Sequence, residues 1–88
     1  MQPLDELLNR IRWDAEFGTG LFALGYYDRV ARREQLVLFS DVRFDTDSPG
    51  MFTVEDEDGV VRRIPLHRVR TVYKNGAVIW QRPAPQEP

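Results

Sequence analysis

The 88-residue chain has no cysteine and only one histidine, His67. Without cysteine it forms no disulfide, has no thiolate nucleophile and cannot build a metal site on sulfur. With a single histidine it also lacks the paired His-x-Thr/Ser motifs that place an acid and a base on opposite sides of a reacting phosphate. We therefore expect neither a metal nor a cofactor, and binding is better supported than catalysis.

Two acidic clusters are superficially similar to calcium loops, DTD at 45–47 and DEDG at 56–59. An EF-hand loop needs a bidentate glutamate at its twelfth position. Counted from Asp56, the twelfth position is His67, so the spacing excludes this kind of site. We interpret both clusters as solvated loops or turns.

The chain also has no apolar run long enough to cross a bilayer, and it begins without the basic and apolar regions of a signal peptide. We therefore expect a cytoplasmic protein with no membrane segment. Hydrophobic residues make up 42% and charged residues 30%, the balance of a soluble domain with one core. The prediction is one domain over residues 1–82 and a disordered tail, PAPQEP, at 83–88.

Residues 3–13 predict an amphipathic helix, because their leucine and isoleucine residues recur at helical spacing. The rest of the chain is β-rich, and the Asn75-Gly76 pair is a strong hairpin signal. The fold class that follows is α+β, with the helix packed on a mostly antiparallel sheet of five or six strands. The expected strands are 21–30, 36–44, 51–55, 60–66, 70–74 and 77–81. The helical residues expected to cover one face of the sheet are Leu7, Leu8, Ile11 and Trp13.

The sequence YYDR at 26–29 carries two adjacent tyrosines near the end of the first expected strand. Neighbouring residues of a strand point to opposite faces, so at most one tyrosine joins the core, and Tyr26 lies on the side of Phe22 and Leu24. The other, Tyr27, can offer its ring to stack a base. Asp28 and Arg29 form a charged pair at the strand end, which is also an ordinary surface feature.

Charge is distributed unevenly along the chain. Residues 41–58 contain seven acids and one base, whereas residues 59–82 contain six bases and no acid. This arrangement predicts a positive strip within a protein whose net charge is −2. Eleven of the twelve bases are arginine, the better bidentate partner for phosphate.

The segment IPLHRVR at 64–70 contains a proline, the histidine and two arginines. Pro65 cannot donate to a sheet, so it indicates a strand end or an edge, followed by a tight corner. Such a corner exposes backbone N–H groups together with His67 and Arg68, which suits a compact anion. There are two alternatives. The first is a structural corner whose arginines are solvated, and the second is a catalytic site in which His67 pairs with Asp28.

Five segments in this order resemble one family over residues 3–82: PLDELLNRIRWD, YYDR, FTVEDEDG, IPLHRVR and NGAVIWQR. They are similar to the RNA cyclic group end recognition domain, also called the RNA repair domain. The resemblance implies a module for RNA repair or processing that recognises ends bearing a 2′,3′-cyclic phosphate or its opened products. The positions that match the family motifs are Asp28, Arg29, His67, Arg68, Trp80 and Arg82.

The sequence and the resemblance together predict a non-catalytic module that binds RNA ends. His67 and Arg68 would clamp the phosphate, with Arg29 and Arg70 as supporting cations. Tyr27 or Trp80 would stack on the terminal base. Asp28 would orient Arg29 or His67, or would accept a hydrogen bond from a ribose hydroxyl. Arg82 would complete the site.

Two alternatives remain. The first is a protein–protein interaction domain, docking through the β-edge near Pro65 and the AVIW hairpin, that assists an RNA ligase or phosphoesterase in trans. The second is a weak cyclic phosphodiesterase that uses His67. The sequence leaves open the oligomeric state and whether Arg29 and Arg68 share one surface.

Overall fold

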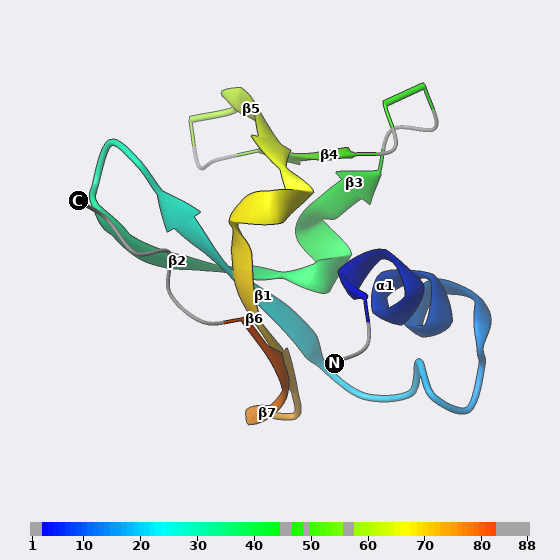
Figure 1. Ribbon diagram of the computed structural model, residues 1–88. Coiled ribbons are helices and arrows are strands. Elements are labelled where there is room, and N and C mark those ends of the chain that lie inside the picture. Colours follow the sequence, from blue (N-terminus) through cyan, green and yellow to red (C-terminus); the bar gives the residue numbers. More distant parts are fainter. Residues whose placement is uncertain (1–2, 45–46, 49, 56–57, 83–88) are drawn as a thin grey trace.

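The computed structural model describes residues 3–44, 47–48, 50–55 and 58–82 (Figure 1). The predicted tail and parts of the DTDSPG and DEDG segments lie outside these residues. Within the described residues, one helix is followed by seven strands and two 3₁₀ turns. Their order is α1 (Leu4–Trp13), β1 (Phe22–Asp28), β2 (Arg33–Leu38), η1 (Phe39–Asp41), β3 (Val42–Phe44), β4 (Met51–Glu55), β5 (Val61–Pro65), η2 (Leu66–Arg68), β6 (Val69–Lys74) and β7 (Ala77–Gln81).

The strands form two antiparallel sheets, which corrects the prediction of one sheet with five or six strands. One sheet has the order β2-β1-β6-β7 and the other has the order β3-β4-β5. The expected strand 36–44 is divided, because η1 interrupts it at Ser40 and Asp41. Serine and aspartate side chains compete for backbone hydrogen bonds and favour turns over a sheet ladder. The chain therefore leaves the first sheet at η1 and enters the second.

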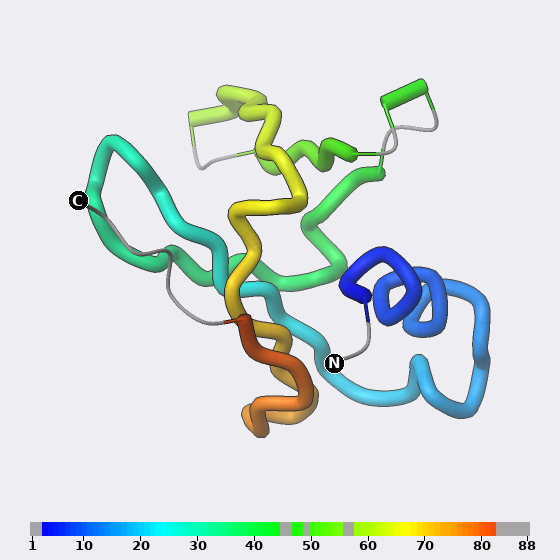
Figure 2. The backbone as a smooth tube through the Cα atoms, in the orientation of Figure 1, coloured from blue at the N-terminus to red at the C-terminus, as the bar shows by residue number. Residues whose placement is uncertain are grey.

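The return to the first sheet occurs at the corner that Pro65 predicts. Pro65 ends β5, which is an edge strand, and η2 then turns the chain into β6 (Figure 2). A proline at the end of an edge strand removes no ladder hydrogen bond from a central strand. The prediction of a corner after Pro65 is confirmed, and its residues join the two sheets.

The helix and the two sheets contribute side chains to one hydrophobic core within the described residues. Phe22 and Leu24 of β1 are buried, and the Tyr26 ring packs edge-on against Phe52 with centroids 6.1 Å apart. The expected inward face of β1 is thus confirmed. The buried helix residues are Leu4, Leu7, Leu8 and Ile11.

Trp13 does not cover a sheet, contrary to prediction, because its side chain is 75% exposed. A helix advances about 100° per residue, so Trp13 lies nearly opposite Ile11 around the axis. The Arg12 guanidinium instead lies over its ring, 5.1 Å from the centroid.

The predicted Asn75-Gly76 hairpin joins β6 to β7, with φ angles of 52° and 84° at these residues. Such positive φ angles are typical of a tight two-residue turn. Asn75 also accepts a hydrogen bond at Oδ1 from the backbone N–H of Leu21 and donates from its own N–H to the Leu21 carbonyl. The hairpin therefore fixes the segment that leads into β1.

Candidate functional site

A cleft of about 140 Å³ lies between the end of β1 and the strand β5, and we call it the end cleft. It is lined by residues 26–30, residues 62–64 and Arg68. It brings Arg29, from the turn after β1, onto one surface with Arg68, from η2. Of the predicted site residues, Tyr27, Asp28, Arg29 and Arg68 line this cleft.

Two further arginines, Arg62 and Arg63 of β5, line the same cleft. They belong to the predicted positive strip but were not singled out, because a strand position alone does not say which neighbouring element it faces. With Arg29 and Arg68, they give the described wall of the cleft four guanidinium groups against one carboxylate, that of Asp28. This charge balance favours an anionic ligand.

Asp28 shapes the turn that carries Arg29. Its Oδ1 accepts hydrogen bonds from the backbone N–H groups of Val30 and Ala31, at 2.9 and 3.2 Å. The pKa of Asp28 is lowered, first by the Ala31 and Val30 hydrogen bonds and then by the charges of Arg62 and Arg33. The carboxylate thus interacts with the backbone of its own turn rather than with the imidazole of His67.

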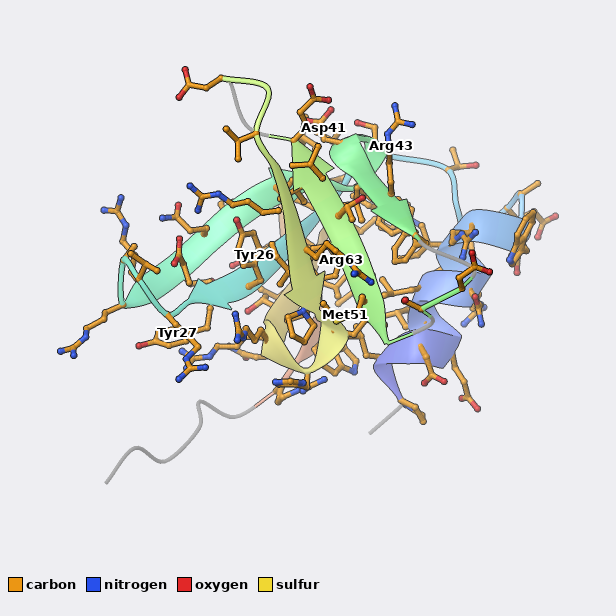
Figure 3. All side chains as sticks on the ribbon, turned by 90° about the horizontal axis from the view of Figure 1, so that it is seen from above. Tyr26, Tyr27, Asp41, Arg43, Met51 and Arg63 are labelled. Atoms are coloured by element: carbon orange, nitrogen blue, oxygen red, sulfur yellow. The ribbon has the colours of Figure 1, made fainter. Side chains whose placement is uncertain are left out.

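The two tyrosines at the end of β1, both labelled in Figure 3, lie in different surroundings. Burial raises the pKa of Tyr26, and the nearby charge of Asp28 adds to this effect. The half-buried Tyr27 ring has the Arg70 guanidinium 4.3 Å from its centroid. Arg70 is not part of the cleft wall, and its buried Nε has no hydrogen-bond partner among the residues that the structure describes. It therefore supports the Tyr27 ring through a cation–π contact and does not itself line the cleft.

The side chains around η2 separate into distinct roles. His67 is exposed and is not part of the end-cleft wall, so it does not share the cleft with Arg68. Arg82 donates from Nη1 to the carbonyl oxygen of His67 at 2.7 Å, which braces the turn. Trp80 is only 8% exposed and belongs to the core, so it does not offer the exposed stacking platform that the sequence suggested.

A second cleft, of about 340 Å³, lies at the opposite end of β5 and was not predicted. We call it the β3–β5 cleft. Figure 3 places Asp41 and Arg43 at this end of the three-stranded sheet, far from Tyr27. The lining residues are Ser40, Asp41, Arg43, Thr53, Val54, Glu55 and Val61. Its two carboxylates make it a poorer phosphate site than the end cleft.

Over the described part of the chain, no helix is both long and apolar enough to cross a membrane. The same residues include no group of three or more His, Asp or Glu side chains placed to hold a metal ion.

Comparison with known families gives one match that covers nearly the whole chain. The model of the MJ1316 RNA cyclic group end recognition domain matches residues 1–82. Searches of curated proteins and of solved structures found no match.

Proposed function

This chain belongs to the family of the MJ1316 RNA cyclic group end recognition domain, and we propose that it binds a terminal RNA phosphate in the end cleft without catalysis. The family description supports an RNA end as the ligand. The phosphate chemistry, the binding residues and the absence of catalysis are our proposal.

This proposal is based on the observation that Arg29 and Arg68 line the same cleft. Guanidinium groups donate paired hydrogen bonds that fit the oxygens of a phosphate. These two arginines come from different elements, so a phosphate between them is held from two sides. Arg62 and Arg63 add positive charge along the β5 wall.

The size of the cleft indicates that it takes only part of a nucleotide. Its volume of about 140 Å³ is below the range of about 300–1,000 Å³ for pockets that enclose a drug-sized ligand. A phosphate with part of its ribose fits this size, and the base then lies outside. Tyr27 stands at the cleft and offers the ring face away from Arg70 for stacking that base.

The lining supports recognition rather than turnover. Opening a cyclic phosphate requires an acid and a base on opposite sides of the phosphorus. The titratable non-arginine groups of the cleft wall are Tyr26, Tyr27 and Asp28, and Asp28 already accepts two backbone hydrogen bonds at Oδ1. His67, exposed on the same turn as Arg68, is proposed as a secondary contact to the RNA chain outside the cleft.

A module that reads an RNA end without altering it acts together with an enzyme. We propose that this role lies in RNA repair or processing, with a ligase or phosphoesterase in trans. The enzyme then receives an RNA whose end has already been selected by its phosphate.

Fluorescence titration of one oligoribonucleotide with four different 3′ ends tests the proposal. The ends are 2′,3′-cyclic phosphate, 3′-phosphate, 2′-phosphate and hydroxyl. We expect a phosphate-bearing end to bind at least about tenfold more tightly than the hydroxyl end, the equivalent of one charge-assisted contact. Arg68→Gln should remove this difference, whereas Arg12→Gln on the exposed side of α1 should retain it.

Equal affinity for all four ends would contradict the proposal. Mass spectrometry of the cyclic end after prolonged incubation gives the second readout. Conversion to an opened phosphate that is lost in His67→Ala would support the phosphodiesterase alternative instead.

A further inference from the structure

The β3–β5 cleft combines groups that accept and donate hydrogen bonds on one surface. Asp41 and Glu55 contribute carboxylates, Arg43 contributes a guanidinium, and Ser40 contributes a hydroxyl. Within the described residues, the side chains of Asp41, Arg43 and Glu55 make no ion pair or hydrogen bond with another residue. Their capacity for directional contacts therefore remains available to a ligand.

The mixture of charges restricts which ligand fits. Two carboxylates repel a phosphate, and the adjacent Arg43 disfavours a metal cation. A neutral group with donors on one edge and acceptors on the adjacent edge matches both kinds of side chain. Guanine has this arrangement, since N1–H and the N2 amino group can donate to a carboxylate while O6 and N7 can accept from a guanidinium.

Uracil and hypoxanthine match this set of side chains less well. Uracil has a single ring N–H between two carbonyl groups, so it offers a carboxylate only one donor. Hypoxanthine, the base of inosine, keeps N1–H, O6 and N7 but lacks the amino group. The series guanine, hypoxanthine and uracil therefore removes the matching contacts stepwise.

The position of the cleft connects it with the end cleft. Thr53 of β4 pairs with Arg43 of β3 on one side and with Arg63 of β5 on the other. Arg63 lines the end cleft, and Val61, two residues earlier on the same strand, lines the β3–β5 cleft. Two strand residues span about 7 Å, so residues that line the two clefts lie close together on β5, although the clefts open toward opposite ends of the strand.

We propose that the β3–β5 cleft binds a guanine base of the same RNA, upstream of the terminal phosphate. This inference rests on the proposed function, because the phosphate in the end cleft sets the register of the chain. Arg63 lies along the path between the two clefts. Asp41 or Glu55 accepts hydrogen bonds from N1–H and the amino group of guanine, and Arg43 donates hydrogen bonds to O6 and N7.

The test uses oligouridines with one common terminal phosphate. A single upstream uridine is replaced in turn by guanosine or inosine, at each of the first four positions from the end. At one position, we expect guanosine to bind about tenfold more tightly than uridine, as for one good bidentate contact. The affinity for the inosine oligonucleotide should lie between those for the guanosine and uridine oligonucleotides.

Neutral variants separate base recognition from general electrostatics. Asp41→Asn and Glu55→Gln reduce repulsion of RNA, so a merely electrostatic role predicts tighter binding of every oligonucleotide by a similar factor. Base recognition predicts instead that the guanosine-to-uridine ratio falls toward one in at least one of them. Glu16→Gln, a change at an exposed carboxylate next to α1, should leave the ratio unchanged.

The outcomes also separate this inference from the proposed function. Equal binding of all bases with a retained preference for phosphate ends would overturn the guanine site and leave the end cleft intact. If no end preference exists, titration with guanosine and uridine, followed by amide NMR, examines the cleft alone. If guanosine but not uridine shifts the amide resonances of Thr53 and Glu55, the result supports the guanine site. If guanosine causes no such shifts, the result overturns it.

Discussion

Arg82 donates from Nη1 to the carbonyl oxygen of His67 at 2.7 Å, and its backbone N–H donates to the carbonyl of Arg70 at the same distance. These two bonds tie the end of the described chain to both sides of Arg68. The sequence pattern groups Arg82 with the phosphate-binding residues, whereas this geometry gives it a positioning role. It holds the turn from which Arg68 reaches the end cleft.

The first prediction concerns Arg82→Gln. Loss of the charged donor should lower the free energy of unfolding by about 1 kcal/mol, since the hydrogen bond is exposed. It should also speed amide exchange at Arg68 and Val69 in the free protein. Hydrogen exchange measured by NMR checks this, with Arg82→Lys as the variant that keeps a charged donor. A residue that only contacts phosphate would leave exchange in the free protein unchanged.

The second prediction concerns the ring of Tyr27. Tyr27→Phe keeps the cation–π contact with Arg70, whereas Tyr27→Leu should lose about 0.5–1 kcal/mol of stability with that contact. If the ring also stacks a base, Tyr27→Leu should weaken binding of an RNA end by about 1–3 kcal/mol, and Tyr27→Phe much less. An oligonucleotide with an abasic terminal residue is the control, and it should bind both variants alike. Equal losses for the abasic and normal ends would exclude stacking.

The third prediction concerns the pH dependence of stability. Two backbone N–H groups lower the pKa of Asp28 from its ordinary value of 3.8, so the folded state favours the charged form. The resulting stability is present above that ordinary pKa and is lost as pH falls through the lower folded pKa. Asp28→Asn should therefore cost stability at pH 7, and this cost should shrink under strongly acidic conditions.

Urea denaturation of wild type and Asp28→Asn from pH 7 down to about pH 2 measures this difference. Glu16→Gln serves as the control at an exposed carboxylate outside the turn. A cost of Asp28→Asn that does not change with pH would show that the charge of Asp28 contributes nothing to the turn.

Local signals in the sequence predict most of the elements. The helix, the Asn75-Gly76 hairpin and the corner after Pro65 all depend on residues close together in the chain. The division into two sheets depends on Ser40 and Asp41, which sit inside a run whose flanks otherwise favour a strand. Packing between the sheets decides whether this run forms a turn or a continuous strand. The sequence pattern does not contain that information.

The candidate site was predictable only in part for a similar reason. The sequence singles out Tyr27, Asp28, Arg29 and Arg68, largely through the resemblance to the family, but it leaves open whether these residues share one surface. The structure brings them to the wall of one cleft. The sequence does not show that the wall of β5 faces the end of β1, so Arg62 and Arg63 were missed. Nor does it show that Trp80 points inward, because aromatic residues of a hairpin serve equally well in a core or on a surface.

We propose that Arg29 and Arg68 hold the same terminal phosphate. A double-mutant cycle with Arg29→Gln, Arg68→Gln and the combined variant measures this directly, using titration of a 3′-phosphate oligonucleotide and its hydroxyl-ended counterpart. We predict that each single change weakens binding of the phosphate end by about tenfold, and that the two changes are coupled by at least about 0.5 kcal/mol. The coupling should vanish for the hydroxyl end. Additive effects, or the same losses for both ends, would contradict a shared phosphate site.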